Sequence, residues 1–118
     1  MNGAIPVGID AQYGGSAENR TPEHLFTAAI LNCFLASFQI IAGTRGLVYD
    51  AIEARADAKV EKSDGTLWVS ECRIDATIHG CADRAQAGEL LDRAERACII
   101  KNSVKTSVTI TTAFSDAL

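Results

Sequence analysis

The sequence predicts an α+β domain in which two helices pack on one antiparallel sheet. Three observations lead to this fold class: a long uncharged apolar stretch, two alternating segments around an Asp-Gly turn, and a second amphipathic stretch followed by a last alternating segment. In chain order they predict helix, hairpin, helix and strand, which favours an α+β arrangement. The 118 residues suffice for one modest core and not for two, so we expect a single domain over residues 1–118.

The first expected helix runs from Pro22 to Ala42. Thr21 suits the N-cap, and Glu23 in the first turn favours the positive end of the helix dipole. Gly43 and Gly46 follow at its C-terminal end. The apolar side chains cover more than one face: Leu25, Phe26, Ile30, Leu31, Phe34, Leu35, Phe38, Ile40 and Ile41. Such a helix needs cover from its own sheet and from another helix or another subunit.

The same stretch, from Leu25 to Gly43, carries no charge and is close to the length that spans a bilayer. Polar residues interrupt it, and no basic cluster flanks it. A helix that is apolar all round is usually buried at the centre of a fold, so we expect a core helix. A membrane-associated subunit is the weaker alternative.

A β-hairpin is expected next. Between Val48 and Val60 the even positions include the apolar Val48, Ile52, Ala54, Ala56, Ala58 and Val60, and the odd ones include the charged Glu53, Arg55, Asp57 and Lys59. This is the period of a half-buried strand. The turn is Ser63-Asp64-Gly65, and Asp-Gly is typical of a tight hairpin. The return strand, from Thr66 to His79, is expected to bury Trp68, Cys72, Ile74, Ala76 and Ile78.

The second helix is expected from Asp83 to Lys101, with Asp83 and Gln86 as a capping pair. Its apolar stripe consists of Ala87, Leu90, Leu91, Ala94, Ala97 and Cys98. A last strand is expected from Ser103 to Phe114, and a short strand near the N-terminus from Ile5 to Ile9.

Charge and the N-terminal sequence restrict the functional classes. A formal net charge of −4 with scattered Lys and Arg argues against a nucleic-acid partner. The first residues lack the basic and long apolar regions of a secretory signal. We therefore expect a cytoplasmic protein, in which the four cysteines stay free unless they are catalytic or bind metal.

The four cysteines lie in unlike surroundings. Cys72 is expected on the inward face of a strand, as a core residue. Cys81 follows the end of that strand and has no evident role. A zinc site from these two with Cys98 and His79 is conceivable, but no Cys-x-x-Cys pair supports it, so we expect neither metal nor cofactor. Cys33 and Cys98 each lie on an apolar helix face, where a thiol is either inert packing or half of a redox pair.

Two stretches around these thiols form distinct signatures. One is Pro22-Glu23-His24-Leu25-Phe26 with Asn32-Cys33-Phe34, in which the thiol follows the glutamate by ten residues. The other is an Ala-rich helix that ends in Ala97-Cys98 and continues as Ile99-Ile100-Lys101-Asn102-Ser103. In this order, with a hairpin between them, the two stretches resemble the OsmC/Ohr family of small dimeric thiol peroxidases. The resemblance covers roughly Gly14 to Thr112.

This resemblance implies an OsmC-like fold, an intertwined homodimer, and reduction of organic hydroperoxides in oxidative-stress defence. It implies that Cys33 is the peroxidatic cysteine and Cys98 the resolving one, and that a dithiol reductant reopens their disulfide. It also implies that Glu23 holds an arginine that stabilises the thiolate. The family's arginine lies in a hairpin upstream of the first helix, where this chain has only Arg20, and the family usually has proline in the place of Ile99.

Helix geometry constrains such a site. Ten residues of straight helix span about 15 Å, so Glu23 cannot touch Cys33 of its own chain. Either the helix bends sharply or Glu23 comes from a second subunit, and two such helices packed antiparallel about a twofold axis would form two equivalent sites. We therefore expect a homodimer. The alternative to an enzyme is a non-catalytic OsmC-like dimer that binds a small apolar molecule or acts as a thiol sensor.

Overall fold

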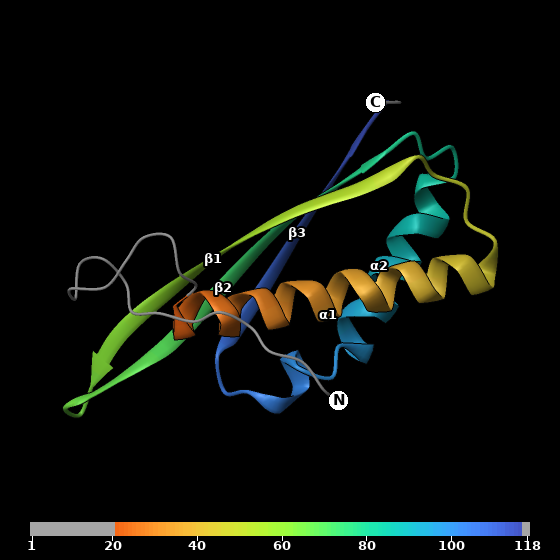
Figure 1. The fold of residues 1–118 in the computed structure, drawn as a ribbon. Coiled ribbons are helices and arrows are strands. Elements are labelled where there is room, and N and C mark those ends of the chain that lie inside the picture. The colour runs from red at the N-terminus through yellow and green to blue at the C-terminus, as the bar shows by residue number, and fades with distance from the viewer. Residues whose placement is uncertain (1–20, 117–118) are drawn as a thin grey trace.

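A computed structural model describes residues 21–116 of the chain. Its elements follow the order α1, β1, β2, α2, η2, β3 (Figure 1). Their bounds are Pro22–Arg45 for α1, Ala51–Ser63 for β1, Thr66–His79 for β2, Arg84–Ala97 for α2, Lys101–Ser103 for the 3₁₀ helix η2, and Ser107–Ser115 for β3. The strand expected over Ile5–Ile9, like Arg20, lies outside the described residues.

Helix α1 begins where the sequence predicts and ends one turn later. The Thr21 hydroxyl accepts a hydrogen bond from the backbone N–H of His24 at 3.1 Å, which confirms the N-cap. The helix continues past Ala42 to Arg45 and ends at Gly46, whose φ of 70° is the left-handed conformation that glycine adopts without strain. The result is an uninterrupted helix of 24 residues.

The hairpin is confirmed, and its turn explains its register. Strands β1 and β2 pair antiparallel, and Asp64 and Gly65 both have positive φ, at 51° and 79°. This is the backbone of the tight turns whose twist matches that of paired strands. The first strand begins later than predicted, because Val48 lies in the preceding loop and is 78% exposed.

The last strand contradicts the expected antiparallel sheet. Strand β3 lies parallel to β2, with Val108 opposite Cys72 and Phe114 opposite Ile78, so the sheet is mixed. The physical reason is the crossover: the chain leaves β2 at His79, returns through α2 and η2, and re-enters the sheet in the direction of β2. The α+β class is confirmed, but the expected antiparallel pairing of the last strand was wrong.

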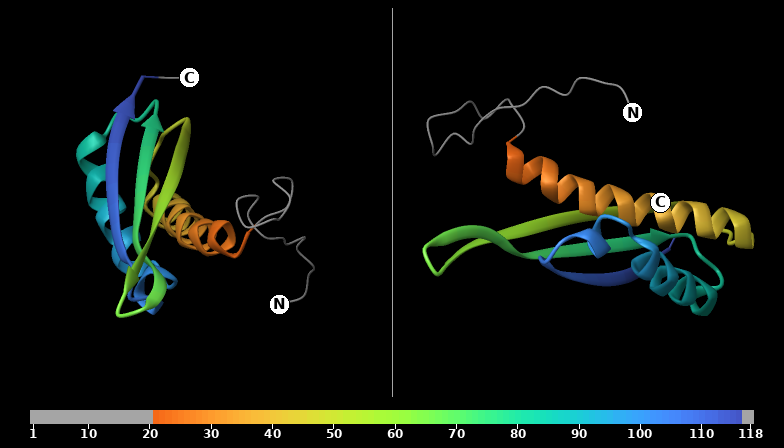
Figure 2. Two further views of the ribbon diagram at one scale, coloured as in Figure 1. Left: turned by 90° about the vertical axis from the view of Figure 1, so that its left-hand side faces the viewer. Right: turned by 90° about the horizontal axis from the view of Figure 1, so that it is seen from below.

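Both helices cover the same face of the sheet, as Figure 2 shows. Alternation along β2 agrees with this, because its inward residues are buried while Arg73 on the other face is exposed. The largest buried side chains include Ile30, Phe34, Phe38, Ile74, Ile78 and Leu90. Helix α1 is long and apolar enough by length and composition to cross a membrane, with a mean hydropathy of 1.9. In this fold it is the core helix, packed on the sheet and on α2.

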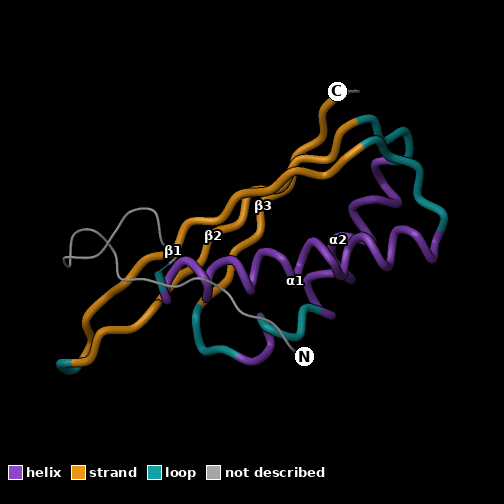
Figure 3. Tube along the Cα trace, in the orientation of Figure 1, coloured by secondary structure: helices purple, strands orange, loops and turns teal. Residues whose placement is uncertain are grey.

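The boundaries near the end of the chain differ from prediction. Helix α2 begins as expected, with the Asp83 carboxylate accepting from the N–H of Gln86 at 3.0 Å. It ends at Ala97, and Cys98 becomes its C-cap with extended backbone angles. A turn and η2 then precede β3, which pairs only with the second half of β2. The tip of the β1–β2 hairpin therefore projects beyond β3 (Figure 3).

Candidate functional site

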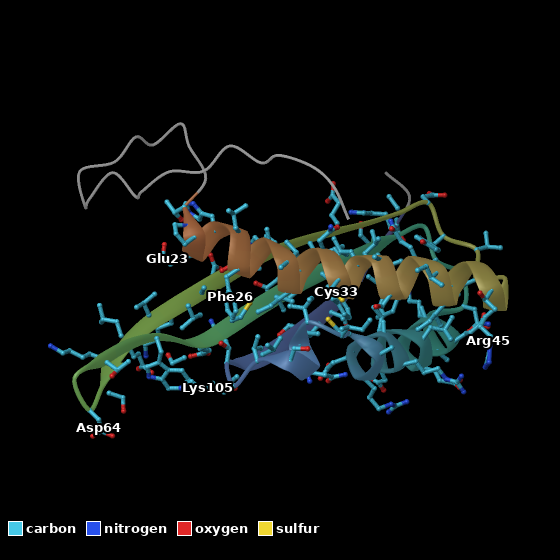
Figure 4. The ribbon with its side chains drawn as sticks, turned by 60° about the horizontal axis from the view of Figure 1, so that its bottom comes forward. Glu23, Phe26, Cys33, Arg45, Asp64 and Lys105 are labelled. Carbon is cyan, nitrogen blue, oxygen red and sulfur yellow. The ribbon has the colours of Figure 1, made fainter. Side chains whose placement is uncertain are left out.

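The fold brings Cys33 and Cys98 together from two helices. Cys33 lies in the middle of α1, and Cys98 caps the C-terminal end of α2. The Cys98 thiol points to the backbone carbonyl of Ile30, one turn before Cys33, with a sulfur–oxygen distance of 3.9 Å. The two thiols are close enough to shift each other's pKa, and both are free. Figure 4 shows Cys33 on the side of α1 that faces α2 and η2.

The environment of Cys33 favours the thiolate. Burial raises the pKa of this half-buried thiol, but four hydrogen bonds act in the opposite sense and prevail. They come from the backbone N–H groups of Ile100 and Ile99, from the Cys98 thiol and from the Ser37 hydroxyl. The pKa of Cys33 therefore lies below its ordinary value. Ser37 was not predicted, although its position one turn after Cys33 places it on the same helix face.

The environment of Cys98 favours the neutral thiol. This side chain is fully buried, and burial is the main reason that its pKa lies above the ordinary value. The neighbouring Cys33 raises the pKa further, whereas the backbone N–H groups of Lys101 and Ile100 lower it only in part. Cys33 consequently ionises first, and Cys98 remains a neutral thiol. A half-buried nucleophile thus lies next to a buried thiol that can attack it later.

A short turn after Cys98 provides the backbone donors. Its ends are joined by the N–H of Asn102 to the Cys98 carbonyl and by the N–H of Ser103 to the Ile100 carbonyl, each at 3.0 Å. The Ser103 hydroxyl also donates to the carbonyl of Ile99 at 2.7 Å. These bonds fix the turn while leaving the N–H groups of its first residues available. Sequence periodicity could not indicate this feature, because it lies in an irregular segment.

Glu23 lies far from the two thiols. It is exposed in the first turn of α1, and because the helix is continuous, about 15 Å of helix separates it from Cys33 (Figure 4). A sharp bend, one of the two explanations considered from the sequence, is therefore wrong. Within residues 21–116, no basic side chain forms an ion pair with Glu23.

Glu23 also lines a groove that the sequence did not predict. The groove has a volume of about 930 Å³ and lies between the first half of α1 and the projecting end of the hairpin. Its walls include His24, Leu31, Val60 and Trp68. A long helix beside a two-stranded ribbon leaves such a space because the third strand does not reach this end of the sheet.

The remaining cysteines are structural. Cys72 is fully buried, and burial together with the charge of Asp57 raises its pKa. Cys81 is buried, and its thiol donates to the carbonyl of Asp83 at 3.5 Å. Over residues 21–116, no three His, Cys, Asp or Glu side chains come together as metal ligands, so the conceivable site from these cysteines and His79 does not form.

The chain belongs to the OsmC-like protein family, whose model matches residues 15–113. An OsmC-like protein of unknown function from Vibrio cholerae has a TM-score of 0.75 at 24% identity, covering 83% of this chain and 67% of that one. An organic hydroperoxide resistance protein from Legionella pneumophila has a TM-score of 0.72 at 18% identity, with 92% and 78% covered. Another organic hydroperoxide resistance protein, from Bacillus subtilis, has a TM-score of 0.63 at 23% identity, covering 88% of this chain and 75% of that one. These identities are low, so the structural likeness establishes the fold. No curated protein matches the chain by sequence.

Proposed function

We propose that this protein is a cysteine-based peroxidase that reduces organic hydroperoxides in defence against oxidative stress. The observation that carries the proposal is the thiol pair: a half-buried Cys33 with a lowered pKa in contact with a buried Cys98 whose pKa is raised. Only the thiolate is a good nucleophile, so this arrangement supports attack by Cys33 and resolution by Cys98. Membership of the OsmC-like family supports the proposal, and so do structurally similar proteins that are named for organic hydroperoxide resistance.

The reaction balances with these two residues and a dithiol. The Cys33 thiolate attacks one peroxide oxygen, the S–O bond forms, the O–O bond breaks, and the alkoxide takes a proton to leave as an alcohol. Sulfur has then lost two electrons and is a sulfenic acid. Cys98 attacks this sulfur, the S–S bond forms, and the oxygen leaves as water with the Cys98 proton. A dithiol returns two electrons and two protons through thiol–disulfide exchange.

The surroundings of the thiol pair favour organic over inorganic peroxides. Ile99 is an exposed apolar residue next to Cys98, and the following residue, Ile100, is apolar and partly buried against the core. An alkyl chain gains free energy when it leaves water for such a surface, whereas hydrogen peroxide gains nothing.

We further propose that the active form is a homodimer in a reducing, cytoplasmic setting. Glu23 is too far from Cys33 to act on it within one chain, so its role in binding an activating arginine requires the site of a second subunit. A cytoplasmic dithiol pool would supply the reductant and keep the four cysteines free between cycles.

The test is the intact mass of the full chain under non-reducing conditions, before and after stoichiometric cumene hydroperoxide. We expect the wild type to lose two hydrogens and to contain a Cys33–Cys98 bridge. Cys33→Ser should show no such loss, whereas Cys72→Ser should behave as wild type because Cys72 is buried in the core. Two free thiols after treatment of the wild type would refute the peroxidase. They would leave a non-catalytic dimer that binds a small apolar molecule, or a thiol sensor that responds to a different oxidant.

A further inference from the structure

Strand β3 forms one margin of the sheet, and within residues 21–116 no strand pairs with its outer edge. The strand order is β1-β2-β3, so β1 and β3 lie at opposite margins (Figure 2). The Ser115 carbonyl accepts from the N–H of Gly80 at 3.0 Å, on the side of β2. Successive residues of a strand direct their backbone groups to alternate edges. The residues whose N–H and C=O groups point to the open edge are therefore Val108, Ile110, Thr112 and Phe114.

The two margins of the sheet differ in charge. Strand β1 has charged side chains along its whole length: Glu53, Arg55, Asp57, Lys59, Glu61 and Lys62. Such charges protect an edge strand from pairing with another chain. Strand β3 has no charged residue and no proline, and most of its residues are β-branched and favour strands. The β3 margin, unlike the β1 margin, therefore has the properties of an edge that pairs with a further strand.

The charges next to β3 indicate that the further strand is a second β3. Lys105 lies two residues before the strand, and Asp116 directly follows it. The Asp116 side chain is fully exposed, although it lies 3.7 Å from Arg84. When two copies of β3 run antiparallel, Lys105 of each copy lies near Asp116 of the other, so unlike charges meet at both ends. A parallel pair would bring like charges together.

We propose that β3 pairs antiparallel with β3 of a second copy about a twofold axis at Thr111, which joins the two sheets into one. Thr111 is the middle residue of Ser107–Ser115, so this register gives the longest overlap. It places Val108 opposite Phe114 and Ile110 opposite Thr112, which are the residues with outward backbone groups. The contact is separate from the proposed homodimer, which is built on α1, so it joins one such dimer to another.

Disulfide formation between introduced cysteines tests the register. Thr111 directs its backbone groups to β2, so its two copies would form a non-hydrogen-bonded pair. The Cα atoms of such a pair are about 4.5 Å apart, within the range of a disulfide. Thr109 is exposed on the same face, but its two copies would be at least about 13 Å apart.

With oxidised glutathione as the oxidant, Thr111→Cys should form covalent dimers on a non-reducing gel. Thr109→Cys should not form them, and neither should the wild type, whose own cysteines are buried or half-buried. Equal dimer formation by the two variants, or none by Thr111→Cys, would overturn the proposal.

A charge exchange at Thr111 tests the association itself, by sedimentation at chain concentrations up to about 1 mM. Thr111→Lys places two like charges opposite each other across the axis, and so does Thr111→Glu. The wild type should reach at least about twice the average mass of either variant, and an equal mixture of the two variants should recover the wild-type mass. Recovery in the mixture excludes misfolding as the reason for the lower masses. Equal masses of the wild type and Thr111→Lys at every concentration would overturn the proposal. They would leave the β3 edge to residues 1–20 of the same chain or to a strand of another protein.

Discussion

At the scale of single residues, the two thiols of the site differ because their surroundings differ. Polar neighbours lower the pKa of the half-buried Cys33, whereas burial raises the pKa of the fully buried Cys98. The Cys98 side chain lowers the pKa of Cys33 and the Cys33 side chain raises that of Cys98, so the contact between the two thiols separates their roles. Packing alone would bury both thiols and raise both pKa values.

The lowered pKa of Cys33 predicts a pH-dependent stability. The folded chain binds the proton of Cys33 less tightly than the unfolded chain does, so this residue stabilises the fold as pH rises from its folded pKa to the unfolded value of about 8.5. The contribution is complete above that value and is lost as pH falls through the folded pKa. Urea unfolding of the reduced wild type and Cys33→Ser should give free energies of unfolding whose difference shifts in favour of the wild type over this interval. A difference that is constant with pH would contradict the lowered pKa.

The burial of a side chain predicts how much its removal lowers the free energy of unfolding. Phe38 is fully buried and lies against Tyr49, with ring centroids 5.5 Å apart. Phe38→Ala should lower the free energy of unfolding by about 3–5 kcal/mol, because it removes apolar contacts and leaves a cavity. The exposed neighbour Gln39 provides the control. Gln39→Ala should change the free energy of unfolding by less than about 0.5 kcal/mol. Thermal or urea unfolding measures both, and similar losses would contradict the core position of Phe38.

At the scale of elements, local chemistry made some features predictable. The N-caps Thr21 and Asp83 and the Asp-Gly turn act within a few residues, so the starts of both helices and the hairpin could be located from the sequence. The parallel direction of β3 depends on the path of a whole crossover, which no local pattern contains. Cys33 and Cys98 could be identified as candidates because each lies in a recognisable helical stretch. The backbone N–H groups that lower the pKa of Cys33 could not be, because they lie in an irregular turn.

Two glycines in different elements predict opposite effects of the same substitution. Gly80, between β2 and α2, has φ 68°, and the Asp50 side chain occupies the place where a Cβ would stand. Gly80→Ala should therefore destabilise the fold by at least about 1 kcal/mol. Gly88 lies inside α2 with open space around it, so Gly88→Ala should stabilise the fold by about 0.5–1 kcal/mol. Melting temperatures of the two variants measure both effects. A shift in the same direction for Gly80→Ala and Gly88→Ala would contradict the prediction.

At the scale of the whole molecule, one chain leaves apolar surface uncovered. The described part measures 47 × 31 × 29 Å, because the hairpin tip projects away from the core. Val60 and Leu67 on this tip are 47% and 67% exposed, and both line the groove beside α1. Farther along α1, Ile40 is 69% exposed. These surfaces support the proposed homodimer, since a second copy of the same helix and hairpin would cover them.

A mixing experiment tests whether the two subunits share their sites. In an intertwined dimer, Glu23 of one subunit serves Cys33 of the other, so Glu23→Gln and Cys33→Ser should each be nearly inactive alone as peroxidases. When the two variants are unfolded together and refolded in equal amounts, about half of the dimers are mixed. Each mixed dimer then has one site with both native residues, which predicts about a quarter of the wild-type rate of cumene hydroperoxide reduction. Mixing without refolding is the control and should restore nothing while the subunits stay paired. If refolding restores no activity either, although light scattering shows dimers and the wild type recovers, Glu23 does not act across the interface. Its carboxylate would then be only a favourable charge at the start of α1.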